Sequence, residues 1–331
     1  MTPAVQLDFL DLRHFSAQHL RPLLEEEGAV WSRDLRWDYR SSASLVLQYI
    51  DSHLLSGYVA LDQGRVCGYI FCVYENEKAV IGDVFASRTQ AGEAAAAAIE
   101  SQLIERLIET LQSTPGLTRI EAQLLLHRHN VHREPFERAG FRLYPRLFLE
   151  KELRTESEKA GDRGSAIAAF PEGARFRQWL TADIETAPHL ITAAYAGHID
   201  SEINDQYLSV GGAQRFLHNI VRFPGCGHFE ESCSWALQIP GQARLLGLLL
   251  CSRVSSSMGH ITQICVLPEL QHHGIGERLL QLCAASLGQA GCDAVSLTVT
   301  EENRTAISVY ERAGFRSRHR FDAMLWESHW R

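Results

Sequence analysis

The chain has 331 residues, of which 45% are hydrophobic and 22% are charged, the proportions of an ordinary globular protein rather than a disordered one. That length exceeds one typical domain and predicts two. The net charge of −8 argues against a general binder of nucleic acid or of anionic membranes, because neither is attracted by a negative field.

The first residues carry no basic start and no hydrophobic signal core, and no run of 18 hydrophobic residues occurs. The eight cysteines are scattered without Cys-x-x-Cys pairs, and most lie in hydrophobic stretches. Buried reduced thiols explain this pattern better than disulfides or a zinc site. We therefore expect a cytoplasmic protein that has no membrane partner.

A seven-residue segment occurs twice in the chain, as FERAGFR at residues 136–142 and as YERAGFR at residues 310–316. The two copies lie 174 residues apart, a period that is too long for a solenoid and that indicates duplication of a whole domain. A polar, glycine-bearing segment without hydrophobic periodicity separates the halves. The predicted domains are residues 1–152 and 171–331, joined by a linker at 153–170.

Other landmarks follow the same order in both halves. Each half has a strand ending in a valine, Val84 or Val266, and a glycine eight residues later, Gly92 or Gly274, that begins a long helix. Short strands come next, and the repeated segment follows them. This order predicts an α/β (α+β) fold, in which each half is a mixed, mostly antiparallel sheet flanked by helices.

Residues 266–276 read VLPELQHHGIG and place a glycine-rich turn between a strand and a helix. Glycines let the backbone approach phosphate oxygens, and the free N–H groups of a helix N-terminus favour an anion. A tight strand-to-helix connection is the simpler explanation. A Rossmann dinucleotide site is disfavoured, because the preceding strands are of antiparallel type and only one fingerprint glycine spacing fits.

The Gln-x-x-Gly-x-Gly pattern of this turn and residues 303–315 (NRTAISVYERAGF) together resemble the two signature motifs of the GNAT N-acetyltransferases. The resemblance covers 171–331 well and 1–152 in outline, and the tandem arrangement is similar to that of the mycothiol synthases. It implies acetyl-CoA as co-substrate, no metal, and acetyl transfer to a small-molecule or peptide amine in a ternary complex.

The same resemblance implies which residues bind the cofactor. The pyrophosphate is held by Gln271 and by the backbone N–H groups of the five residues that follow it, His272, His273, Gly274, Ile275 and Gly276. The pantetheine arm pairs with the backbone of Ile264, Cys265 and Val266. Asn303 touches the cofactor or caps its helix. His273 stands where the family usually has arginine or lysine, so its charge depends on pH.

Tyr310 is the predicted general acid, because the matching tyrosine of the family lies beside the thioester sulfur and can protonate the leaving thiolate. The alternative is a tyrosine that only packs. His260 is the candidate base, since imidazole titrates near neutral pH and strand alternation puts His260, Thr262, Ile264 and Val266 on one face. A hydrogen-bonded histidine at a strand end is the alternative there.

A polar cluster at residues 195–207 follows the first expected helix of the second half. Its acidic groups suit a cationic amine, and the candidate acceptor-binding residues are His198, Asp200, Asn204 and Asp205. A solvated loop that caps the next helix explains the cluster equally well.

The N-terminal half is predicted to be poorly equipped for turnover. Thr89 replaces Gln271, Glu93 brings negative charge toward the phosphate position, and Phe136 replaces Tyr310 and has no proton to donate. A structural role is the expectation for this half. A non-catalytic acyl-CoA-binding regulator and a scaffold for a protein partner are alternatives for the whole chain.

His127, His129 and His132 lie close together in the N-terminal half. Their spacing scatters the side chains, and no carboxylate or cysteine nearby in the sequence completes a metal site. The sequence therefore predicts exposed polar positions here.

Overall fold

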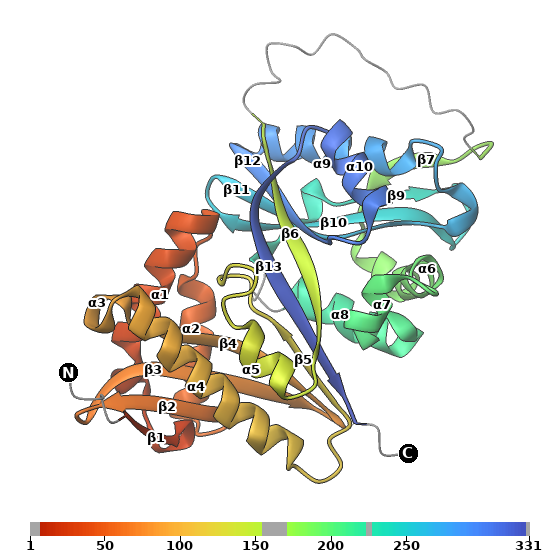
Figure 1. Cartoon of the computed structure of the whole chain (residues 1–331). Helices are drawn as coiled ribbons and strands as arrows, with labels where there is room; N and C mark the ends of the chain where they lie inside the picture. Colours follow the sequence, from red (N-terminus) through yellow and green to blue (C-terminus); the bar gives the residue numbers. More distant parts are fainter. Residues whose placement is uncertain (1–6, 154–170, 223–226, 329–331) are drawn as a thin grey trace. The chain divides into compact units, whose positions relative to one another are not determined.

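The computed structural model describes residues 7–153, 171–222 and 227–328 (Figure 1). The chain divides into two compact units, one of residues 1–145 and 320–331 and the other of residues 146–319. The linker predicted at 153–170 lies outside the described residues, apart from Leu153, and the predicted domain boundaries stay predictions. Among the described residues, no helix is long and hydrophobic enough to cross a membrane.

The N-terminal unit is a mixed sheet in which β4 and β5 run parallel and the other neighbouring strands run antiparallel. Its strands, in spatial order, are β1 (Leu7–Asp11), β2 (Ser56–Asp62), β3 (Arg65–Glu75), β4 (Lys78–Ala86), β5 (Arg119–Gln123) and β13 (Arg316–Glu327). Its helices are α1 (Ala17–Leu35), α2 (Arg40–Asp51), α3 (Arg88–Ala91), α4 (Glu93–Gln112) and α5 (Arg133–Arg138). One hydrophobic cluster packs α4 on the sheet, and another packs α1 and α2 on it.

The C-terminal unit repeats this plan, with β11 and β12 parallel and the other neighbouring strands antiparallel. Its strands, in spatial order, are β6 (Arg142–Glu152), β12 (Ala294–Thr300), β11 (Met258–Val266), β10 (Leu245–Ser255), β9 (Trp235–Gln238) and β7 (Arg175–Gln178), with β8 (His228–Phe229) on β10. Its helices are α6 (Ala187–Ala194), α7 (Ile199–Ile203), α8 (Val210–Arg222), α9 (Ile275–Gln289) and α10 (Arg304–Arg312). The predicted fold class is confirmed.

In both units the parallel pairing is short. It joins residues 78–81 to 119–122 in one unit and residues 258–261 to 294–297 in the other, and then the strands separate. One residue beyond that point, β4 and β11 each have a register shift against their antiparallel neighbour, which leaves Gly82 and Thr262 unpaired. A bulge of this kind bends and twists a strand, so each sheet opens between its two parallel strands.

The bulge also reverses the side-chain alternation of β11. Gly259 faces α9, since a Cβ there would meet a leucine of that helix at 2.6 Å, and His260 therefore faces away from α9. Val266 pairs with Gly247, and a Cβ on Gly247 would meet Ile275 at the start of α9 at 3.6 Å. His260 and Val266 thus lie on opposite faces. The prediction that they share one face is wrong, because the bulge shifts the period by one residue.

Two carboxyl groups, those of Glu27 and Asp83, are buried together in the N-terminal unit. The Trp31 indole N–H donates to Glu27 at 3.1 Å and the Tyr69 hydroxyl donates to it at 2.5 Å. Burial raises the pKa of Glu27, and burial together with the nearby Glu27 charge raises the pKa of Asp83. The folded state therefore holds a proton on this pair that the unfolded chain releases.

We expect Asp83→Asn to stabilise the protein increasingly as the pH rises from about 4 to about 8. The unfolded Asp83 carboxyl ionises near 3.8, whereas the folded one keeps its proton, so wild-type stability falls as the pH rises between the two pKa values. The asparagine keeps the shape and a donor but does not titrate. Thermal melts across this range should show an advantage that grows by about 3 °C or more; a pH-independent difference would contradict the assignment.

Candidate active site

The turn between β11 and α9 has the geometry of an anion-binding site. His272 and Gly274 adopt positive φ angles of 63° and 81°, and such turns direct successive N–H groups to one side. Among the described residues, the backbone N–H groups of 272–276 have no hydrogen-bond acceptor. The positive end of the α9 dipole adds to this field. We call residues 271–276 the cradle, and its groups suit a pyrophosphate.

Two predicted cofactor residues also have structural partners. The Gln271 amide donates to the Val266 carbonyl at 3.2 Å, which ties the cradle to the end of β11. The Asn303 side chain accepts from the Ala306 N–H at 3.1 Å and caps α10. Asn303 is therefore an N-cap, one of its two predicted roles, and its contact with the cofactor stays a prediction.

Ile264, Cys265 and Val266 lie on β11 beyond the last residue that pairs with β12. Their backbone faces the opening between the two strands, where an extended ligand could add hydrogen bonds as a strand does. The Tyr195 hydroxyl donates to the Ile264 carbonyl at 3.4 Å. The site thus combines an open strand edge with an anion cradle at the end of the same strand.

Tyr310, on α10, is 8% exposed. Burial raises the pKa of its phenol above the usual value, and the negative charge of Asp200 raises it further, while Arg146 acts in the opposite direction. The phenol therefore keeps its proton at neutral pH, as a general acid must.

One acceptor candidate, Asp200, lies close enough to Tyr310 for its negative charge to raise the pKa of the phenol. Asp200 lies on α7 and is buried, and the Thr300 hydroxyl at the end of β12 donates to its carboxylate. His198 caps α7 by accepting from the Asp200 N–H at 3.1 Å. Asp200 is therefore a buried carboxylate at the opening between the strands. Its binding of an acceptor stays a prediction.

Asn204 and Asp205 lie where α7 gives way to a short 3-10 helix, η4 (Asp205–Leu208), and both are half-buried. Next to them Tyr207 stacks on Tyr195, with ring centroids 4.2 Å apart. The two tyrosines bound the polar cluster that the sequence singled out, and the stack holds its ends together. The acceptor roles of Asn204 and Asp205 stay predictions.

The candidate base His260 is buried on β11. Its Nδ1 lies 2.9 Å from the Ser296 hydroxyl and its ring stacks on Phe148 at 6.3 Å. Burial, with a smaller contribution from Arg146, lowers the pKa of the imidazole to about 3. It is therefore neutral at neutral pH, and its conjugate acid is a strong one. The catalytic role of His260 stays a prediction.

Gln263 is a candidate site residue that the sequence reasoning missed. Its Oε1 accepts from the Tyr207 hydroxyl at 3.3 Å, while its buried Nε2 has no hydrogen-bond partner among the described residues. An unpaired buried donor costs about 1–3 kcal/mol, and an acceptor on a bound ligand would remove that cost. The bulge at Thr262 puts Gln263 on the same face of β11 as His260, and no sequence pattern predicts that bulge.

The equivalent turn of the N-terminal unit is already occupied by the protein. The Glu26 carboxylate accepts from the backbone N–H groups of Arg88 and Thr89, at 2.8 and 3.0 Å, and from the Ser87 hydroxyl at 2.7 Å. These N–H groups begin α3 and precede Gly92 and the start of α4, so they are not the counterparts of the N–H groups at 272–276. The expected impairment of this half stays a prediction.

The bulges also correct the predicted equivalence of Val84 and Val266. Counted from the unpaired residues Gly82 and Thr262, Ala86 corresponds to Val266. The stretch from Ala86 to Gly92, which has a positive φ, is therefore two residues shorter than the stretch from Val266 to Gly274. The N-terminal turn lacks part of the cradle.

Comparison with known proteins agrees with this geometry. Residues 202–315 match the model of the acetyltransferase (GNAT) family. A mycothiol acetyltransferase of Actinosynnema mirum is 32% identical over 95 residues, and the match spans 29% of this chain and 32% of that protein. The chain therefore covers only about a third of this curated relative's length.

Two solved structures share the fold. A GCN5-related N-acetyltransferase from Sphaerobacter thermophilus matches with a TM-score of 0.64 and 15% identity, over 97% of this chain and 95% of that one. A tandem GNAT protein from the clavulanic acid biosynthesis pathway matches with a TM-score of 0.54 and 14% identity, over 97% and 98%. At these identities the likeness concerns the fold alone.

The C-terminal unit is a mixed sheet that opens between two parallel strands, with an anion cradle at the end of one of them. It carries a GNAT acetyltransferase domain, as the family match over 202–315 shows.

We expect Gly276→Ala to weaken CoA binding by about tenfold or more without loss of stability. A Cβ at Gly276 meets no atom of the protein within 4 Å, and at the second residue of α9 we expect it to crowd a phosphate bound in the cradle. Isothermal titration with CoA and thermal melting give the two readouts. Gly288→Ala is the matched control, because Gly288 also lies in α9 with no atom near its Cβ. Both variants should gain helix propensity; equal CoA affinities would show that Gly276 does not line the phosphate site.

Proposed function

We propose that this chain is an N-acetyltransferase that transfers the acetyl group of acetyl-CoA to an amine by direct attack in a ternary complex. The observation that carries the proposal is the cradle, whose N–H groups at 272–276 lack acceptors at the end of an open strand edge. A protonated Tyr310 near the same opening supplies the acid.

In this mechanism the amine nitrogen forms a bond to the thioester carbonyl carbon, and the carbon–sulfur bond breaks. The departing sulfur takes its proton from the Tyr310 hydroxyl, which regains one from solvent. The cradle and the β11 edge position the co-substrate, and their fixed dipoles need no reorganisation during the reaction. Acetyl-CoA supplies the activated acyl group.

The attacking amine must lose a proton, and the site offers two groups for that task. His260 is the predicted base, but its conjugate acid has a pKa of about 3, so the neutral imidazole takes a proton poorly from an ammonium group. Asp200 is the buried carboxylate whose charge acts on the Tyr310 phenol, and it can bind a cationic acceptor directly. We therefore add Asp200 to His260 as a candidate for proton removal.

The acceptor belongs to the class of small-molecule or peptide amines. The matched relative is a mycothiol acetyltransferase, but the match covers a third of that protein and assigns no acceptor here. Release of free CoA in the presence of an amine panel tests the proposal. CoA binding without turnover on any amine would favour the acyl-CoA-binding regulator instead.

Tyr310→Phe should lower kcat by about 10²-fold with little change in the KM for acetyl-CoA. The substitution removes the proton donor and leaves the ring in place. Steady-state assays of free thiol, together with a melting curve, check this expectation. Wild-type turnover in a folded Tyr310→Phe protein would remove this residue from the mechanism.

Asp200→Asn should raise the KM for a cationic acceptor by about 30-fold or more, because a buried carboxylate loses its charge. Glu202→Gln is the matched control, since Glu202 lies on the same short helix and is exposed. His260→Gln and Asp200→Asn, each assayed at saturating acceptor, separate the two candidate bases. A large loss of kcat in His260→Gln, with the kcat of Asp200→Asn close to wild type, would assign the base to His260 and exclude Asp200.

A further inference from the structure

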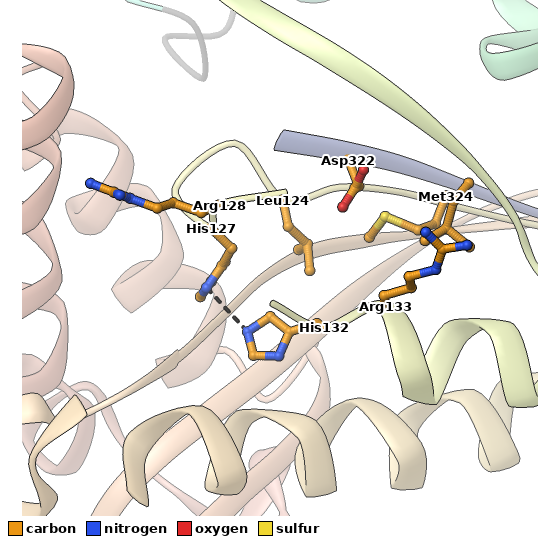
Figure 2. Close-up of a pocket in the computed structure, with 8 residues that line it drawn as sticks. Leu124, His127, Arg128, His132, Arg133, Asp322 and Met324 are labelled. Carbon is orange, nitrogen blue, oxygen red and sulfur yellow. Dashed lines mark hydrogen bonds between the residues drawn. The ribbon is translucent and has the colours of Figure 1, made fainter. Parts of the chain in front are cut away.

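Three side chains able to bind a metal converge in the N-terminal unit. Glu100 comes from α4, His127 follows β5, and His132 is the N-cap of α5. All three are buried, and Figure 2 shows the two imidazoles directed at each other. The prediction that these histidines are scattered and exposed is wrong. The carboxylate that completes the set comes from a helix 27 residues earlier in the chain.

The distances between the three nearest atoms suit a tetrahedral ion. His132 Nε2 lies 3.2 Å from His127 Nδ1 and 3.2 Å from Glu100 Oε2, and the remaining separation, His127 Nδ1 to Glu100 Oε2, is 3.7 Å. Ligands bound to zinc at about 2.0–2.1 Å in a tetrahedron stand about 3.3–3.4 Å apart. The three atoms therefore occupy three corners of a zinc-sized tetrahedron.

In both histidines, the ring nitrogen that does not face the cluster has a hydrogen-bond partner of its own. His127 Nε2 donates to the Val84 carbonyl at 2.9 Å, so His127 Nδ1 presents a lone pair. His132 Nδ1 lies 3.3 Å from the Ser101 hydroxyl, so its other nitrogen faces the cluster. Imidazoles that bind metals are fixed in this manner by a partner on the second ring nitrogen.

The carboxylate shows the same arrangement. Glu100 Oε1 accepts from the Ala86 N–H at 2.9 Å and from the Arg88 guanidinium. Glu100 Oε2, by contrast, is buried and makes no hydrogen bond of good geometry among the described residues, although it lies beside both histidines. The single proton on His132 Nε2 has two candidate acceptors, His127 Nδ1 and Glu100 Oε2, each 3.2 Å away, and it cannot satisfy both fully. A cation between the three atoms satisfies all of them.

A pocket reaches the same two histidines. It is lined by His127 and His132 and by residues from the neighbouring segments, Leu124, Arg128, Arg133, Leu143, Asp322 and Met324 (Figure 2). Such a pocket gives an ion a path of entry and leaves room for water as the fourth ligand. The third histidine, His129, turns elsewhere, with its Nδ1 2.6 Å from Asp322.

We propose that Glu100, His127 and His132 bind a zinc ion in the N-terminal unit, with a water molecule as fourth ligand. Two imidazoles and one carboxylate form a donor set that zinc accepts. The ion joins α4, the segment after β5 and the start of α5, next to the place where β4 and β5 separate. The ion would bridge the segments beside the opening between β4 and β5, whereas the corresponding opening between β11 and β12 is left for a ligand in the proposed function.

The test uses the full-length protein stripped with a chelator and then dialysed. Titration with Zn²⁺ against a chromophoric chelator should show one tight site per chain, and saturation should raise the melting temperature by about 5 °C. Glu100→Gln and His132→Gln should each weaken Zn²⁺ binding by about 100-fold or more. His129→Gln is the matched control and should bind like the wild type. Absence of a tight site in the wild type, or equal binding by His132→Gln, would overturn the proposal.

Two further measurements keep the test decisive if a variant is unstable. CoA titration of each variant reports on the C-terminal unit and shows whether the rest of the chain is folded. Co²⁺ added to the stripped wild type needs no variant, since four-coordinate Co²⁺ absorbs visible light much more strongly than hydrated Co²⁺. An intense visible band that Zn²⁺ removes supports the site, and a spectrum like that of free hydrated Co²⁺ contradicts it.

Discussion

The early end of the parallel pairing between β11 and β12 is the constraint on which the candidate site depends. After four paired residues the strands separate, and the bulge at Thr262 turns β11 away from its neighbour. The separation exposes backbone at 264–266, and it leads to the cradle at the start of α9. Without it, a continuous ladder would occupy every hydrogen-bonding group that an extended ligand needs.

The two units keep this scaffold and use it differently. Both have a four-residue parallel pairing followed by one unpaired residue, as expected after duplication. In the N-terminal unit, the Glu26 carboxylate accepts from N–H groups at the start of α3, and His127 bonds the strand carbonyl of Val84. In the C-terminal unit, the N–H groups of 272–276 have no acceptor among the described residues. The turn after the strand is thus bonded internally in one unit and left open at its last residues in the other.

Burial sets the chemistry of the candidate site more than any single charge does. It keeps the Tyr310 phenol protonated, holds His260 neutral and leaves the Gln263 Nε2 donor without a hydrogen-bond partner among the described residues. The unpaired Gln263 donor costs stability in the free protein, and an acceptor on a bound ligand would offset that cost. This is the expected pattern at a site built for a ligand.

The sequence by itself determined the features that depend on neighbouring residues. The order of strands and helices predicted the mixed sheet, the glycines predicted the turn at the start of α9, and the signature motif at 303–315 singled out Tyr310. Only the tertiary structure decided the bulges, the closure of the N-terminal turn by Glu26 and the meeting of Glu100 with His127 and His132. Turns and helix faces follow from local geometry, whereas side chains from distant segments meet only through packing, which no local pattern records.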